Sequence, residues 1–270
     1  MIDEAIFEAL EEKAEAFQYT SMRYTDFSEV SDYEIIYNND KLILLYGYHP
    51  GKEMNEYHWA SNSSEELLKA IDKKNRAYIS FVPREWMEEL KQFGFEVYAV
   101  FNDYVNPDIR EVECMEEPEL LTEDECEAAS AVTVSCKDQS RGFHGETPEW
   151  MRSWIRGEEP SAVDTGTQNC AVIVHRENDR IVGVVCTATY AHQSEKGPIT
   201  WVREVAVQPD FQKRGIARNL ILQALSYGKA YGAVRAFLMA DECNEHAIRL
   251  YERLGFIGNK AEAQIDMILV

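Results

Sequence analysis

The stretch VQPDFQKRGIA, residues 207–217, joins an apolar run to an amphipathic helix, and the elements around it predict the fold. The run before it, Thr200–Val207, is rich in β-forming residues and stops before Pro209, which predicts a strand. The residues after it predict a helix over 216–231, because apolar side chains recur there at helical spacing: Ala217, Leu220, Ile221, Ala224 and Leu225.

The turn between this strand and this helix has the composition of an anion site. Gly215 has no Cβ, so backbone amides near it can approach an anion closely. The first N–H groups of a helix are unpaired, and the helix dipole favours negative charge beside them. Lys213 and Arg214 add positive charge, although the chain has a formal net charge of −21. The glycine patterns of P-loops and of dinucleotide-binding folds are absent from the sequence, and an ordinary turn with solvated bases stays open as the alternative.

The order of elements around the turn predicts an α/β or α+β domain. Hairpin-paired strands come first, and strands joined through helices follow, which indicates a mixed, mostly antiparallel central sheet flanked by helices. The expected elements are a helix over Pro148–Ile155, strands over Cys170–Val174 and Ile181–Thr189, a strand over Val234–Ala240, a helix over Glu245–Leu254 ended by Gly255, and a strand over Gln264–Val270.

Two segments of the chain share one pattern of elements. Residues 77–95 (AYISFVPREWMEELKQFGF) parallel residues 236–256 (AFLMADECNEHAIRLYERLGF): each predicts a strand, a helix, Gly-Phe and a further strand. We therefore expect two tandem domains, with residues 1–115 a degenerate copy of the later fold or an accessory domain, and residues 121–270 the second domain. The acidic stretch 113–125, which contains a proline, is the expected join.

The ordered set of motifs in the second half resembles the GCN5-related N-acetyltransferase (GNAT) superfamily over about residues 121–270. The motif residues are Val205–Val207, Gln212–Ala217, Asn244, Ala247, Tyr251, Gly255 and Phe256. The resemblance implies the acyl-CoA N-acyltransferase fold and acetyl-CoA as acyl donor. It implies a cofactor site made by Val205, Ala206, Val207, Gln212, Lys213, Arg214, Gly215, Ile216, Ala217 and Asn244. Ala217 replaces a glycine that is commoner in the family.

Acyl transfer to an amine needs a base, an oxyanion donor and an acid. Glu204, on the strand before the turn, is the first candidate for the base, with Asp241 and Glu242 as rivals. A main-chain N–H near Val207 is the candidate donor to the thioester oxygen. The resemblance implies Tyr251 as the acid that protonates the leaving thiolate.

The first copy lacks the residues that this chemistry requires. Leu90 and Pro83 stand where the later copy has Tyr251 and Asn244, and no Q-x-x-G-x-A turn occurs there. The first half is therefore not expected to catalyse.

We thus expect an N-acetyltransferase that moves an acetyl group from acetyl-CoA to a primary amine by direct attack in a ternary complex. The alternatives are a tandem acyl- or aminoacyl-transferase acting on a larger acceptor, and a non-catalytic acyl-CoA-binding module. In the pocket, His144 and the aromatic cluster Phe143, Trp150 and Trp154 are possible contacts for the acceptor.

The composition of the chain indicates which partners it can bind and in which compartment it is expected. A chain with 48 acidic and 27 basic residues is not expected to bind nucleic acid, whereas it attracts a small cationic amine. No apolar run approaches a membrane span, and the amphipathic, acidic N-terminus differs from a signal peptide. The six cysteines contain no C-x-x-C pair, and the six histidines have no ligand spacing. We therefore expect a cytoplasmic protein without a metal site.

Overall fold

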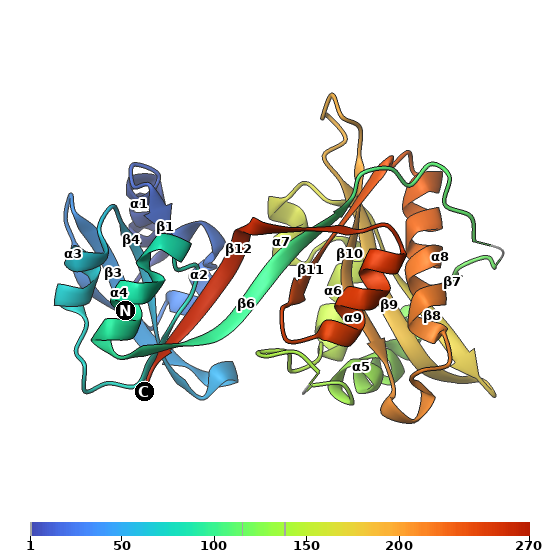
Figure 1. Ribbon diagram of the computed structural model, residues 1–270, viewed down its shortest axis with the longest axis horizontal. Coiled ribbons are helices and arrows are strands. Elements are labelled where there is room, and N and C mark those ends of the chain that lie inside the picture. The colour runs from blue at the N-terminus through green and yellow to red at the C-terminus, as the bar shows by residue number, and fades with distance from the viewer. Residues whose placement is uncertain (1, 115, 138) are drawn as a thin grey trace. The chain divides into compact units, whose positions relative to one another are not determined.

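The structure is a computed structural model that describes residues 2–114, 116–137 and 139–270 (Figure 1). The chain divides into two compact units. Unit 1 comprises Met1–Phe101 together with Ala263–Val270, and unit 2 comprises Asn102–Glu262. Among the described residues, no helix is long and apolar enough to cross a membrane.

Unit 2 is built on a mostly antiparallel sheet, as predicted. The strand order is β6-β11-β10-β9-β8-β7, with β6 contributing its end from Asn102 onward. Among the described residues, β10 and β11 pair in parallel, and the pairs β9–β10, β8–β9 and β7–β8 are antiparallel. Asn178 and Asp179 form the tight turn between β8 and β9, and both have positive φ, which suits the twist of a hairpin. The strands are β6 (Phe95–Asn106), β7 (Glu119–Leu120), β8 (Gln168–Glu177), β9 (Arg180–Tyr190), β10 (Ile199–Val207) and β11 (Arg235–Asp241).

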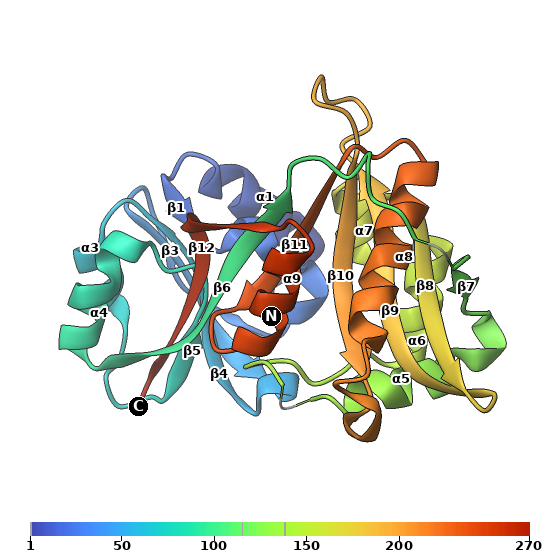
Figure 2. The same cartoon turned by 45° about the vertical axis from the view of Figure 1, so that its right-hand side comes forward.

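Helices cover both faces of this sheet (Figure 2). One apolar cluster joins the sheet to α8 and α9, and a second joins its other face to α5, α6 and α7. A capping box of Thr122 and Glu125 stands ahead of α5, and Thr147 caps α6 through the N–H of Trp150. The helical elements are η4 (Glu123–Glu125), α5 (Cys126–Val134), α6 (Pro148–Arg156), α7 (Pro160–Asp164), η5 (Pro209–Phe211), α8 (Ile216–Ala230) and α9 (Glu245–Arg253).

Unit 1 has a sheet of similar design. The strand order is β2-β3-β4-β5-β12, with β4 and β5 parallel and the neighbouring pairs β2–β3, β3–β4 and β5–β12 antiparallel, while β1 pairs with β4. Helices α3 and α4 pack on one face and α1 on the other. The elements are α1 (Glu4–Ala14), β1 (Tyr19–Thr20), η1 (Met22–Tyr24), α2 (Phe27–Val30), β2 (Glu34–Asn38), β3 (Leu42–His49), η2 (Pro50–Lys52), β4 (Met54–Ser61), α3 (Ser64–Ala70), β5 (Ala77–Ile79), η3 (Arg84–Trp86), α4 (Met87–Phe93) and β12 (Ile257–Leu269).

The shared sequence pattern corresponds to a shared order of elements. Residues 77–95 form β5 and α4 and enter β6, and residues 236–256 form β11 and α9 and lead to β12. The glycine that ends each helix has positive φ, +126° at Gly94 and +88° at Gly255, which explains why both segments have glycine there. The phenylalanine that follows each glycine is buried in the core of its unit.

The compact units divide the chain at other positions than the expected join at 113–125. Tyr104 and Ile109 lie in the core of unit 2, although they precede that join. The final strand begins at Ile257 instead of Gln264, and its end, Met267–Leu269, pairs with β5 in unit 1. Each unit therefore takes a strand from the far side of the sequence-based boundary, which local pattern does not reveal. The assignment of 1–115 as a degenerate or accessory domain stays a prediction.

Candidate functional site

Strands β10 and β11 pair over only part of their lengths, and this leaves an open strand edge in unit 2. Ile199–Trp201 of β10 pair with Arg235–Phe237 of β11. Beyond these positions no further pairing joins the two strands among the described residues, although β10 continues to Val207 and β11 to Asp241. The other edge of β10 stays paired with β9 as far as Val207.

The backbone groups that face the open edge follow from the register with β9. The N–H of Gln208 donates to the carbonyl of Val182 at 2.9 Å, and hydrogen-bonded positions alternate along an antiparallel pair. The backbone of Ala206 therefore faces β9, whereas the N–H and C=O groups of Val205 and Val207 face the opening. The carbonyl of Val207 already accepts bonds from Gln212 Nε2 at 3.0 Å and from Cys136 Sγ at 3.2 Å. The N–H groups of Val205 and Val207 are thus directed toward a ligand in the opening.

The turn that follows β10 presents further N–H groups. Lys213 and Gly215 both have positive φ, +61° and +86°, and Gly215 is the N-cap of α8. Among the described residues, no acceptor pairs with the N–H groups of Gly215, Ile216 and Ala217. A Cβ on Gly215 would meet no atom within 4 Å, so the space in front of the turn is open. The Ile216 side chain is buried in the core and fixes the start of the helix.

The polar side chains of the turn have unequal roles. The side-chain amide of Gln212 donates a hydrogen bond to the Val207 carbonyl and so holds the turn in its conformation. The Arg214 guanidinium donates to the Asp210 carbonyl at 2.8 Å and lies 4.9 Å from the Phe211 ring centre. The Lys213 side chain is exposed.

Glu204 lies at a β-bulge that brings it beside a cation. The register between β10 and β9 shifts between Val202 and Glu204, so Arg203 is an extra residue. Arg203 Nη1 lies 3.1 Å from Glu204 Oε1 and 3.3 Å from Glu146 Oε1. Its guanidinium carbon lies 4.7 Å from the Trp150 ring centre, 5.8 Å from that of Trp154 and 5.7 Å from that of Trp201. The site therefore combines two carboxyl groups, one guanidinium and three indole rings.

Burial raises the pKa of Glu204 to about 8, and the negative charge of Glu146 adds to the effect while Arg203 opposes it. Burial also raises the pKa of the Glu146 carboxyl, again against Arg203. A carboxyl group whose pKa lies near neutrality is suited to accept a proton from an amine.

Tyr251 lies on α9 with its ring centre 6.4 Å from that of Tyr104 and 6.2 Å from that of Phe256. Burial raises the pKa of its phenol well above the usual range, and the charge of Glu204 raises it further. The phenol therefore keeps its proton at neutral pH, as an acid must. The predicted acid, Tyr251, therefore lies close enough to the predicted base, Glu204, for the charge of the carboxylate to act on the phenol.

The rival bases have other partners. The buried Asp241 carboxylate accepts bonds from the backbone and guanidinium of Arg141 and from Cys243. Burial alone would raise the pKa of Asp241, but the bonds from Arg141 outweigh it and hold that pKa at about 2. Glu242 is exposed and lies 3.9 Å from Arg141. These contacts favour Glu204 over both rivals.

Asn244 has a structural role. Its side chain accepts a bond from the N–H of Ala247 at 3.3 Å and caps α9. His144 is exposed, whereas Phe143, Trp150 and Trp154 pack with the apolar cluster under α5 and α6.

Sequence reasoning missed Glu146, Arg203 and Arg141 as parts of this site. Arg141 and Glu146 lie on the segment between α5 and α6, and their partners stand 100 and 57 positions later in the chain. No local spacing links such pairs. The alternation of residues along the strand does not predict the β-bulge at Arg203 either.

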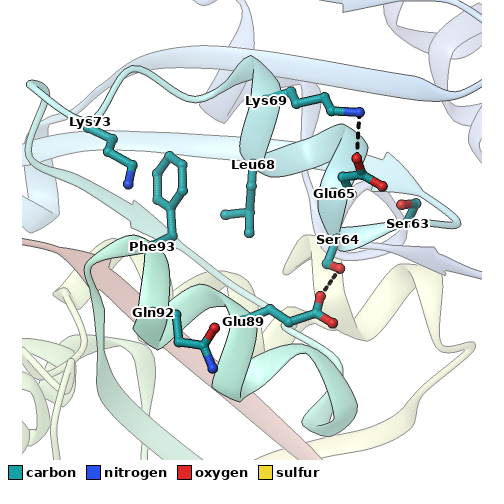
Figure 3. Close-up of a pocket in the computed structure, with 9 residues that line it drawn as sticks. All are labelled: Ser63, Ser64, Glu65, Leu68, Lys69, Lys73, Glu89, Gln92 and Phe93. Carbon is teal, nitrogen blue, oxygen red and sulfur yellow. Dashed lines mark hydrogen bonds and ion pairs between the residues drawn. The ribbon is translucent and has the colours of Figure 1, made fainter.

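A groove in unit 1 holds none of the predicted site residues. Its volume is about 790 Å³, and Figure 3 shows side chains of α3 and α4 facing each other across it. Lys69 pairs there with Glu65, and Ser64 bonds to Glu89. Among the described residues, no group of three or more His, Cys, Asp or Glu side chains could hold a metal ion.

Comparison with known proteins identifies the domain that carries the site. Residues 135–256 match the model of the acetyltransferase (GNAT) family. An uncharacterized N-acetyltransferase of Methanocaldococcus jannaschii is 38% identical over 108 residues, which are 40% of this chain and 44% of that protein. A mycothiol acetyltransferase of Rhodococcus jostii is 35% identical over 114 residues, 42% of this chain and 37% of that protein. The chain thus spans less than half the length of these curated relatives.

Solved structures share the fold at low sequence identity. A GCN5-related N-acetyltransferase from Anabaena variabilis aligns with a TM-score of 0.56 and 11% identity, over 99% of this chain and 71% of that one. A GNAT-family acetyltransferase from Colwellia psychrerythraea aligns with a TM-score of 0.55 and 9% identity, over 97% and 94%. The predicted acyl-CoA N-acyltransferase fold is therefore confirmed.

Proposed function

Residues 135–256 form a domain of the GNAT acetyltransferase family, and we propose that this chain transfers an acetyl group from acetyl-CoA to a primary amine. The observation that carries the proposal is the continuity of two features. The open edge of β10 leads directly into a turn in which, among the described residues, no acceptor pairs with the N–H groups of Gly215, Ile216 and Ala217, and an extended acyl-CoA needs both features.

Acetyl-CoA, the proposed acyl donor, would pair with the open edge of β10 through its pantetheine arm and bind the start of α8 through its diphosphate. The pantetheine arm lies along Val205–Val207 and its amides pair with the backbone groups of Val205 and Val207, as a peptide adds to an exposed strand edge. The diphosphate accepts bonds from the N–H groups at the start of α8, where the helix dipole also favours it. Lys213 and Arg214 add charge beside that site, and Asn244 retains its amide N–H₂ group for the cofactor because only its oxygen caps α9.

The reaction begins with removal of a proton from the acceptor. An alkyl ammonium with a pKa of about 10.4 requires about 4.6 kcal/mol to lose its proton at pH 7. Glu204 takes that proton directly or through water. The neutral nitrogen then attacks the thioester carbon, and the oxygen that gains negative charge accepts bonds from an N–H at Val205 or Val207.

Collapse of the tetrahedral intermediate breaks the C–S bond. The thiolate takes the proton of the Tyr251 phenol, and the proton lost by the amine returns through solvent to the phenolate. The products are the N-acetylated acceptor and free CoA, and no covalent enzyme intermediate forms.

The acceptor is proposed to be a small cationic amine. The site faces α5 and α6 with two carboxyl groups and three indole rings, a combination that attracts cations and binds apolar surface. The net charge of −21 adds long-range attraction.

A thiol-release assay with acetyl-CoA and a panel of amines tests the proposal. Free CoA released in proportion to an amine, and lost in Glu204→Gln and Tyr251→Phe, is the expected result. Calorimetric binding of CoA without thiol release from any amine would instead support a non-catalytic acyl-CoA-binding module. Turnover confined to amines on large carriers would favour the tandem transferase.

A further inference from the structure

We propose that Glu146 is the proton partner of Glu204, so that two carboxyl groups take up the proton released by the acceptor. This inference rests on the proposed acetyl transfer. Arg203 Nη1 lies within 3.3 Å of a carboxylate oxygen of each residue. One guanidinium can neutralise only one of two carboxylates, so the second charge is disfavoured and the pair retains a proton.

The backbone holds Glu146 firmly at this position. Its N–H donates to Thr133 Oγ1 at 2.9 Å, and its carbonyl accepts from Ser130 Oγ at 2.7 Å. The preceding Gly145 has φ +85°, and a Cβ there would lie 2.6 Å from the backbone of Val134. A glycine is therefore required for the segment to approach α5 so closely, and this approach brings the Glu146 carboxyl to Arg203.

The groups that face the pair come from every element packed around it. Cys186 of β9 stands opposite Glu204, and the charges of both carboxylates help burial to raise its pKa, so that the thiol stays neutral. Tyr251 of α9 is likewise neutral at pH 7. Among the described residues, Arg203 and Glu159, the N-cap of α7, also place charge near the pair, and the negative charge of Glu159 raises the pKa of Glu146. These neighbouring groups thus favour a state in which Glu146 and Glu204 together hold one proton.

The proton then moves in two linked steps. In the resting site Glu204 carries the proton and donates it in a hydrogen bond to the Glu146 carboxylate. An ammonium N–H of the acceptor passes its proton to the free oxygen of Glu204, while the proton that Glu204 already held moves to Glu146. The amine becomes neutral and Glu146 becomes a carboxylic acid, whose partly exposed side chain releases the proton to solvent.

The pH dependence of kcat/KM tests this role. Because the charge of Glu146 helps to raise the Glu204 pKa, Glu146→Gln should lower it and shift the acidic limb of the profile to lower pH by about one unit or more. The plateau should fall at least about tenfold, since positioned proton transfer contributes roughly 10²–10⁴. Glu146→Asp should restore the position of the limb, and Glu149→Gln, an exposed site three residues later, should leave the profile unchanged.

An acidic limb that stays in place in Glu146→Gln would overturn the proposal, whatever happens to the plateau. CoA affinity, measured in parallel, shows whether the variant is folded. If it is not, a limb in Glu146→Asp that matches the unaltered protein supports the proposal and an altered one contradicts it. Failure of the underlying acetyl transfer looks different, because the unaltered protein would then release no thiol.

A separate observation in unit 1 carries a second proposal: we infer that unit 1 is a copy of the fold whose donor groove is filled by its own chain. Among the described residues, β4 and β5 pair in parallel at three positions, Asn55–Tyr57 with Ala77–Ile79, as β10 and β11 do in unit 2. In unit 1 the edge of β4 beyond these positions is occupied. Tyr19 and Thr20 pair with Ser61 and Ala60.

Ser21, the residue after Thr20, also hydrogen-bonds to the edge of β4. The N–H of Ser21 donates to the carbonyl of Trp59 at 2.8 Å, and the N–H of Trp59 donates to Ser21 Oγ at 2.9 Å. The edge on which a pantetheine arm would lie is therefore already hydrogen-bonded.

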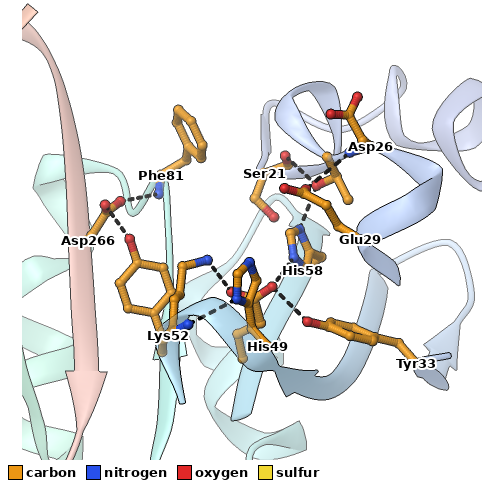
Figure 4. Close-up of polar contacts among 12 residues, drawn as sticks. Ser21, Asp26, Glu29, Tyr33, His49, Lys52, His58, Phe81 and Asp266 are labelled. Atoms are coloured by element: carbon orange, nitrogen blue, oxygen red, sulfur yellow. Dashed lines mark hydrogen bonds and ion pairs between the residues drawn. The ribbon is translucent and has the colours of Figure 1, made fainter. Parts of the chain in front are cut away.

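The Glu56 carboxylate on β4 of unit 1 is already hydrogen-bonded. Tyr33, Lys52 and His58 all bond to the Glu56 carboxylate. Figure 4 shows these three side chains converging. Tyr33 donates to it at 2.8 Å, and His58 Nε2 lies 2.9 Å away. Glu56 is buried, and its carboxylate is already bound by these three side chains.

Native mass spectrometry with CoA, together with hydrogen exchange, tests the second proposal. One CoA per chain is expected, with slow exchange of the Ser21 and Trp59 amides in the protein without CoA. Two CoA molecules per chain, or fast exchange at both amides, would overturn it. A protein that binds no CoA contradicts the proposed function instead, and the exchange rates still decide whether the edge of β4 is closed.

Discussion

Substitution of Gly215 by alanine separates the binding role of the turn from its role in folding. Gly215 has φ +86°, a conformation that costs an L-residue roughly 1–2 kcal/mol. A Cβ at this position meets no protein atom within 4 Å, so no clash adds to the conformational term. The free energy of unfolding should therefore fall by about 1–2 kcal/mol, which lowers Tm by about 2–4 °C per kcal/mol.

Binding of CoA should suffer more than stability. The new methyl group projects into the open space where the diphosphate is proposed to lie, and relaxation of φ turns the N–H groups away from it. Loss of one hydrogen bond to a charged group is worth about 1.5–3 kcal/mol, so Kd should rise at least about tenfold.

The chain offers a matched control at the other end of the same helix. Gly232 has φ +90°, and a Cβ there also meets nothing within 4 Å. Gly232→Ala should lose as much stability as Gly215→Ala and leave CoA affinity unchanged. Thermal unfolding and calorimetric titration with CoA measure both quantities. Equal CoA affinities in the two variants would refute the assignment of the turn.

Three further expectations follow from the site and the fold. Tyr251→Phe should lower kcat by roughly 10²-fold or more while the Kd for CoA stays constant, because the phenol supplies only a proton; an unchanged kcat would remove Tyr251 as the acid. The pKa of Asp241 is about 2 in the folded chain and about 3.9 when unfolded, so its pairing with Arg141 contributes about 2–3 kcal/mol above pH 4, and this is lost as pH falls toward 2. Urea unfolding should show Arg141→Met destabilised at pH 7 and about half as much at pH 3; an equal difference at both pH values contradicts the pairing. Residues 121–270 expressed alone should show no sharp thermal transition, because they lack the buried Tyr104, whose side chain is worth about 3–5 kcal/mol; a sharp transition would show that the sequence-based boundary suffices.

Much of the fold could be predicted because its signals are local. The helix of α8 follows from an apolar stripe, and the end of α9 from Gly255. The turn at Gly215 was predicted as an anion site from the same kind of local signal, and its positive φ agrees with the choice of glycine. Each of these depends on neighbours within one or two helical turns.

The rest depends on long-range contacts that one sequence does not display. The pairing of β12 with β5 joins residues about 190 positions apart, so the unit boundary was not visible in the pattern. The partners of Arg203 include Glu146, and the filled edge of β4 depends on Ser21. In each case the side chain or strand finds its partner through tertiary packing, which composition and spacing do not encode locally.

A crystal structure with CoA bound is the most direct measurement of the central claim. Diphosphate oxygens should lie about 2.7–3.2 Å from the backbone nitrogens at Gly215, Ile216 and Ala217, with the pantetheine arm along the open edge of β10. A diphosphate bound elsewhere, or an arm that makes no backbone contact with Val205 or Val207, would contradict it.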